Sequence, residues 1–127
     1  MKLRIKGNSL RLRLLQGEVK RLVSEGEVSE SICFGTRPVD VLQYTVRISE
    51  SAKDIKVTFV NGVIAVDLSK EITERWAESD EITIESKQDP DVCGIIPQVI
   101  VEKDFVCLDR KDDPDRADAF PHPKANC

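Results

Sequence analysis

Residues 55–68 read Ile-Lys-Val-Thr-Phe-Val-Asn-Gly-Val-Ile-Ala-Val-Asp-Leu, and this stretch decides the fold. Asn61-Gly62 tolerates the positive φ that both central positions of a two-residue type I′ turn require. Pairing outward from that turn places apolar residues opposite one another on one face: Phe59 and Ile64, Val57 and Val66, Ile55 and Leu68. On the other face Lys56 lies opposite Asp67, a favourable cross-strand pair. The stretch therefore predicts an antiparallel β-hairpin with one apolar face.

A second hairpin is predicted at the start of the chain. Gly7-Asn8 places glycine first, as a type II′ turn prefers. That turn pairs Ile5 with Leu10, Leu3 with Leu12 and Lys6 with Ser9. On the opposite face it sets Arg4 across from Arg11 and Lys2 across from Arg13, and like charges in those positions destabilise a strand pair.

The remaining elements follow from hydrophobic periodicity. Alternation of apolar and polar residues predicts strands at 28–34, 41–48, 81–86 and 98–108. Helical spacing predicts helices at 15–25, ended by Gly26, and at 70–78, capped by Ser69 and anchored in the core by Trp76. We therefore expect a single α+β domain over residues 1–109, with two helices and about six to seven strands in a mostly antiparallel, curled or barrel-like sheet. Residues 110–127 read as an acidic, proline-containing tail or surface loop.

Length and composition are those of a soluble single domain. The chain has 127 residues, 33% charged and 40% hydrophobic, with a formal net charge of −4. Its apolar runs are only a few residues long, so no membrane-spanning helix and no membrane partner are expected. The first residues alternate charged and apolar side chains where an export signal needs an apolar core, which predicts a cytoplasmic protein with reduced cysteines.

Metal and cofactor sites are not indicated. Cys93, Cys107, His122 and Cys127 form a conceivable zinc set, but their long, irregular spacings favour cysteines that act as small buried hydrophobes. The aspartates between 109 and 118 lack the glycine and glutamate of a calcium loop. Neither nucleotide-binding glycine motif is present. We therefore expect no metal and no cofactor.

The distribution of charge is the one pattern that suggests a ligand. The first 21 residues carry one acid, Glu18, and seven basic residues in an otherwise acidic chain: Lys2, Arg4, Lys6, Arg11, Arg13, Lys20 and Arg21. Three interpretations stay open: a solvated face, a face covered by the acidic tail with Phe120 as anchor, and a site for a phosphate, a nucleotide or a nucleic-acid backbone. The candidate anion-binding residues are Lys2, Arg4, Lys6, Arg11, Arg13 and Lys103.

Two acids on the predicted 98–108 strand allow a catalytic interpretation. Glu102 and Asp104 share a face, and burial there would shift their pKa values as in a catalytic site. The alternative is that they form structural ion pairs with nearby basic residues such as Arg4 or Arg11. We favour the ion pairs and assign no catalytic residue.

Two stretches carry a family resemblance. Ile-Lys-Gly-Asn-Ser-Leu-Arg-Leu-Arg-Leu at 5–14 and Glu-Lys-Asp-Phe-Val-Cys-Leu at 102–108 resemble the signatures of an uncharacterised bacterial domain-of-unknown-function family. Phe120-Pro121-His122-Pro123 and the terminal Cys127 also fit that family. The resemblance implies a small cytosolic single-domain protein and assigns no activity.

A shorter resemblance concerns residues 7–14 alone. Gly-Asn-Ser-Leu-Arg-Leu-Arg-Leu is similar to a stretch of the AbrB/MazE-like DNA-binding antitoxins, which would imply that Arg11 and Arg13 face DNA. This sequence has Leu15 where those proteins have proline, and the chain runs on for about a hundred residues.

The sequence thus favours a non-catalytic binding or interaction module whose basic N-terminal hairpin binds an anionic ligand. The alternatives are an AbrB/MazE-like DNA-binding antitoxin or regulator, and a small enzyme that acts on an anionic substrate. The partner and the oligomeric state are not specified by the residues.

Overall fold

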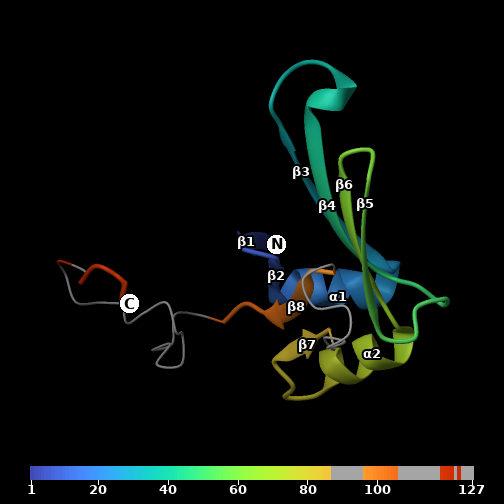
Figure 1. The fold of residues 1–127 in the computed structure, drawn as a ribbon. Helices are drawn as coiled ribbons and strands as arrows, with labels where there is room; N and C mark the ends of the chain where they lie inside the picture. Colours follow the sequence, from blue (N-terminus) through green and yellow to red (C-terminus); the bar gives the residue numbers. More distant parts are fainter. Residues whose placement is uncertain (87–95, 106–117, 122, 124–127) are drawn as a thin grey trace.

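The computed structural model describes residues 1–86, 96–105, 118–121 and 123 (Figure 1). In chain order its elements are β1 (Lys2–Lys6), β2 (Ser9–Leu14), α1 (Gln16–Glu25), β3 (Glu27–Cys33), a 3₁₀ turn (Pro38–Asp40), β4 (Val41–Ile48), β5 (Ile55–Val60), β6 (Val63–Leu68), α2 (Lys70–Glu78), β7 (Thr83–Glu85) and β8 (Gln98–Lys103). The α+β class with two helices is confirmed for this part of the chain.

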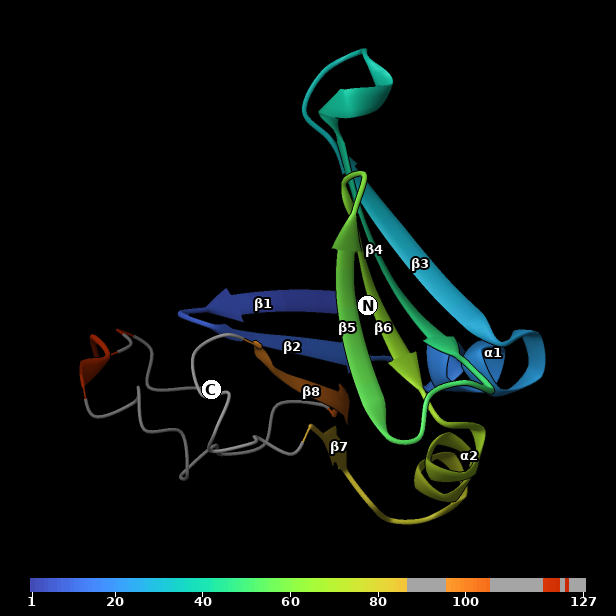
Figure 2. The same cartoon turned by 45° about the vertical axis from the view of Figure 1, so that its right-hand side comes forward.

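The strands form two sheets that cross each other (Figure 2). The short sheet has the strand order β1-β2-β8-β7, and the long sheet has the order β3-β4-β6-β5. The prediction of a single curled or barrel-like sheet was therefore wrong, as was the strand number, since the described residues contain eight strands.

Both sheets are mixed rather than antiparallel throughout. Strands β2 and β8 pair in parallel at the centre of the short sheet, and β4 and β6 do so in the long sheet. Strands β4 and β6 are parallel because the β5–β6 hairpin packs against β4 through its second strand, β6, and not through β5. Alternation within each strand fits a parallel or an antiparallel neighbour equally well, so it did not reveal these pairings.

Both predicted hairpins are confirmed with their registers. Phe59 lies opposite Ile64 and Lys56 opposite Asp67 in the β5–β6 pair. The turn between those strands has φ of 51° at Asn61 and 75° at Gly62, as a type I′ turn requires. In the β1–β2 pair Arg4 lies opposite Arg11 and Lys2 opposite Arg13.

The helix boundaries also agree with the prediction. Gly26 ends α1 in the left-handed conformation, with φ of 85°. The Ser69 hydroxyl accepts a hydrogen bond from the backbone N–H of Ile72 at the start of α2. Trp76 of α2 is fully buried, and its indole Nε1 donates to the Ile82 carbonyl at 2.9 Å.

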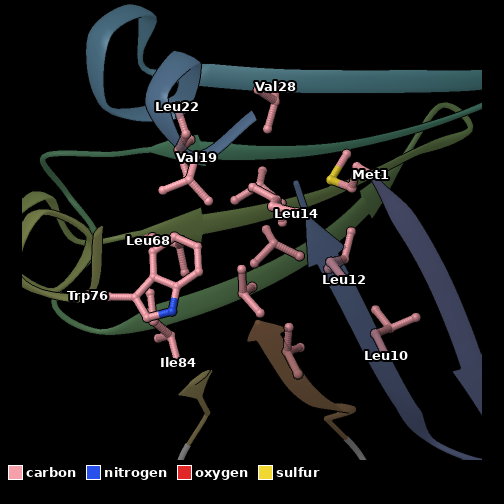
Figure 3. Close-up of a cluster of buried hydrophobic side chains, with 14 of the residues drawn as sticks. Met1, Leu10, Leu12, Leu14, Val19, Leu22, Val28, Leu68, Trp76 and Ile84 are labelled. Atoms are coloured by element: carbon pink, nitrogen blue, oxygen red, sulfur yellow. The ribbon is translucent and has the colours of Figure 1, made fainter. Parts of the chain in front are cut away.

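The core lies between the crossing sheets and is closed by the two helices (Figure 3). Strand β2 contributes Leu10, Leu12 and Leu14, which are buried because every second residue of the strand faces the long sheet. They belong to one cluster with side chains from the other strands and both helices: Val19, Leu22, Val46, Val66, Leu68, Trp76, Val99 and Val101.

Two expectations about the later part of the chain are affected. The predicted 98–108 strand ends at Lys103, so Asp104 and Phe105 follow it, while 106–108 lie outside the described residues. Most of the predicted tail also lies outside the described residues. The division into a 1–109 domain and a 110–127 tail therefore stays a prediction. Cys33, the cysteine that the structure describes, is an exposed free thiol. The other three cysteines and His122 are not described.

A glycine-to-alanine substitution tests the β5–β6 turn. A Cβ on Gly62 would lie 2.8 Å from the Val41 carbonyl oxygen, at a φ that disfavours L-residues. Gly62→Ala is therefore expected to lower the free energy of unfolding by about 1–3 kcal/mol, measured by urea denaturation. Gly17→Ala is the control, because it meets no atom within 4 Å and alanine favours helix. Equal stability of the two variants would contradict the turn.

Candidate functional site

Five of the six predicted anion-binding residues lie on one face of the N-terminal hairpin. This basic face is the side of the short sheet that points away from the core, and it carries Lys2, Arg4, Lys6, Arg11 and Arg13. Lys103 is not among them. It aligns with Leu14 on the core side of the sheet, where its Nζ donates to the Ser79 carbonyl at 2.7 Å and lies 5.7 Å from the centre of the Trp76 ring.

A glutamate of β8 lies directly beside two of these arginines. Parallel pairing sets Glu102 next to Arg13, whose Nε donates to Glu102 Oε1. The Nη1 of Arg11 lies 3.5 Å from the same oxygen. The Glu102 side chain is only 12% exposed and that of Arg13 16%, so this pair is largely removed from water. The predicted ion pair between Glu102 and Arg11 is confirmed.

Asp104 provides a second carboxylate at the same surface. Its Oδ2 lies 3.0 Å from Lys2 Nζ, and its backbone N–H donates to the Leu14 carbonyl. Carboxylates of the same chain thus neutralise part of the charge on the basic face. Anion binding there, and DNA binding through Arg11 and Arg13, stay predictions.

A polar cluster that the sequence analysis missed surrounds the amino group of Met1. The group donates to Glu18 and, at 2.9 Å, to Glu30, which also accepts a hydrogen bond from Tyr44 Oη at 2.9 Å. Burial alone would lower the pKa of the amino group, but the hydrogen bonds to both carboxylates outweigh burial and raise it. The hydrogen bond from Met1 lowers the pKa of Glu30. The cluster fixes β1 to α1 and β3.

An open groove of about 470 Å³ lies between the N-terminal hairpin and the long sheet. We call it the apolar groove. None of its described lining residues is charged: Ile5, Gly7, Asn8, Ser9, Leu10, Leu42, Val57, Thr58, Phe59, Ile64 and Pro97. Two large side chains at its walls are largely exposed, Phe59 at 68% and Ile5 at 60%.

The groove exists because the short sheet crosses only part of the long sheet. In Figure 2 the long sheet continues well past the crossing of β1, toward the β5–β6 turn. Phe59 lies on the core side of β5, like Val57 and Ile55. Because it is near the turn, the short sheet does not cover it. Ile32 of β3, 47% exposed, shares that uncovered apolar surface.

Sequence reasoning placed Phe59 on the apolar face of its hairpin but did not identify it as a site residue. The missing information is where the second sheet crosses, which no local pattern of β5 contains. The one signal in the sequence was that the apolar face of this hairpin continues up to the turn.

The described residues contain no cluster of metal-ligand side chains and no membrane-spanning helix. No three His, Cys, Asp or Glu side chains among them are grouped so as to hold a metal ion. None of their helices has the length and apolar character to cross a bilayer.

Comparison with known proteins gives one match. The model of a family of unknown function, DUF7009, matches residues 1–124. No curated protein and no solved structure matches the chain.

Proposed function

The chain belongs to the DUF7009 family, and since the function of that family is unknown, we propose one from this chain's own surface. The protein is a non-catalytic interaction module that holds apolar side chains of a partner protein in the apolar groove.

The observation that carries this proposal is the exposure of Phe59 and Ile5 toward one uncharged groove. Exposed apolar surface gathered in a concave site marks interaction surfaces in soluble proteins. Covering the exposed part of Phe59 alone is worth about 2–3 kcal/mol. Aromatic side chains in such positions contribute disproportionately to binding energy.

The shape of the groove favours a protein over a small molecule. Small-molecule sites are concave enough to bury most of the ligand surface. The apolar groove is open to solvent, and the exposed Ile32 of β3 lies next to Leu42 of its lining. An extended partner gains contact along that surface, whereas a compact ligand would leave much of itself in water.

The contacts of Glu102 in β8 support a non-catalytic role. Glu102 accepts from Arg13 and lies beside Arg11, which is the arrangement of a structural ion pair. The Glu102 oxygen that meets both guanidinium groups is already occupied by these contacts, so it is poorly placed to take a proton from a substrate.

A matched pair of exposed phenylalanines tests the proposal. Phe59 and Phe34 are 68% and 73% exposed, but only Phe59 lines the groove. A photo-cross-linking phenylalanine analogue placed at 59 or at 34 in the full chain would identify the protein captured at 59 alone. That partner, purified, is expected to bind Phe59→Ser at least about tenfold more weakly than wild type, and Phe34→Ser within about twofold.

Two outcomes would contradict the proposal. One is that position 59 captures no protein beyond those captured at 34. The other is that the captured partner binds Phe59→Ser as tightly as the unchanged chain.

A further inference from the structure

We infer that the free edge of β5 accepts an extended strand of the partner, antiparallel to β5, with apolar residues at alternate positions and an acidic residue opposite Lys56. This inference rests on the proposed function and specifies the segment that enters the apolar groove.

The hydrogen-bonding pattern of β5 provides the first argument. β5 is the last strand of the long sheet. Val60 and Val63 flank a two-residue turn, so they form a hydrogen-bonded pair, and bonded pairs recur at every second residue. The N–H and C=O groups of Ile55, Val57 and Phe59 therefore point away from β6, toward the open edge.

The residue content of the four edge strands provides the second argument. Charged side chains on an edge strand hinder pairing with a further strand, and a very short edge strand offers little to pair with. β1 carries three basic residues, β3 carries two glutamates, and β7 has three residues. β5 has six residues, a single charge at Lys56 and no proline. Among the described strands it is the edge least protected against an added strand.

The position of the groove provides the third argument. The side chains of Val57 and Phe59 line it from β5, and those of Ile5 and Leu10 line it from the N-terminal hairpin. Figure 2 shows the hairpin extending past β5 at the level of the crossing. Every second side chain of a strand added beside β5 would point to the same face as Val57 and Phe59, and so toward the groove.

Charge complementarity specifies the outward-facing positions. Lys56 does not line the groove: it points to the opposite face of β5 from Val57 and Phe59, and it is exposed. A carboxylate directly across from Lys56 is favourable and a basic residue there is unfavourable. The complementary antiparallel strand therefore reads apolar, polar, apolar, acidic, apolar opposite residues 59 to 55.

A synthetic peptide with that pattern is the probe. Labelled Ser-Ile-Thr-Val-Glu-Ile-Ser places its central valine opposite Val57 and its glutamate opposite Lys56. Its binding to the full chain is measured by fluorescence anisotropy. Phe59→Ser is expected to weaken binding at least about tenfold, with Phe34→Ser as the control.

Backbone methylation separates strand pairing from simple apolar contact. N-methylation of the central valine removes an N–H that bonds to β5, so it is expected to weaken binding about tenfold or more. N-methylation of the threonine alters an N–H that points away from β5 and is expected to leave the affinity within about twofold. Equal effects of the two methyl groups would overturn the inference.

The charged position gives an independent readout. Replacing the peptide's glutamate with lysine is expected to weaken binding about two- to fivefold at low salt, and Lys56→Gln should abolish that difference. A difference that persists in Lys56→Gln would contradict the register. A partner that binds through Phe59 while the peptide does not bind would overturn strand addition and leave the proposed function standing.

Discussion

Trp76→Ala is expected to lower the free energy of unfolding by about 4 kcal/mol, because the largest side chain of the core is lost. Trp76 is fully buried and packs with Leu68 and Ile84 in the core (Figure 3). Alanine would leave a cavity at the junction of α2 with both sheets and would remove the donor that bonds to the Ile82 carbonyl. Since domains of this size are stabilised by only about 5–15 kcal/mol, the loss is readily measured by chemical denaturation.

Two further variants make this result interpretable. Trp76→Phe keeps most of the apolar volume and loses the hydrogen bond, so an intermediate loss of about 1–2 kcal/mol is expected. Phe34→Ala removes an aromatic ring that is 73% exposed and should change stability by no more than about 0.5 kcal/mol. If Trp76→Ala were as stable as Phe34→Ala, Trp76 would not be the anchor of the core.

Glu102→Gln is expected to lower the free energy of unfolding by about 2–3 kcal/mol. The carboxylate is mostly buried between strands, beside Arg13 and Arg11. Glutamine preserves the shape of the side chain but leaves two guanidinium groups close together without their counter-charge. Glu81→Gln breaks the exposed pair with Arg75 and is the control, with an expected loss within about 1 kcal/mol.

The same variant tests anion binding at the basic face. In Glu102→Gln an uncharged amide replaces the carboxylate. Sulfate is expected to raise the melting temperature of this variant more than that of wild type, because the anion replaces the missing charge. Sodium chloride at equal ionic strength controls for screening. An equal response to sulfate in both proteins would show that Glu102 does not neutralise an anion site.

The hairpins and helix ends could be predicted because their determinants are local. Asn61-Gly62 and Gly7-Asn8 define the turns, and each turn fixes the register of the residues around it. Gly26 and Ser69 define helix ends in the same way, through the conformation or the hydrogen bond of a single residue.

The arrangement of the sheets could not be predicted from such signals. Strand β2 pairs in parallel with β8, which follows it by more than eighty residues along the chain. The alternating leucines of β2 require an apolar neighbour but do not specify which strand supplies it or in which direction. The division into two crossing sheets depends on these long-range pairings.

The candidate site shows the same division between local and long-range information. Alternation along the N-terminal hairpin was enough to gather five basic residues on one face. Alternation also applies to β8, where the neighbours Glu102 and Lys103 must face opposite sides of the sheet. The sequence therefore contained the information that Lys103 does not join the arginines. The exposure of Phe59 was not predictable, because it depends on where the short sheet crosses.

The central claim is that an extended strand binds beside β5 with its apolar side chains in the apolar groove. It is tested most directly by ¹⁹F NMR of the chain labelled with fluorophenylalanine at its four phenylalanines. The signals of Phe59 and Phe34 are assigned from the Phe59→Ser and Phe34→Ser variants. On addition of the probe peptide we predict a shift of the Phe59 signal and an unchanged Phe34 signal. A Phe59 signal that stays in place at saturating peptide would contradict the account.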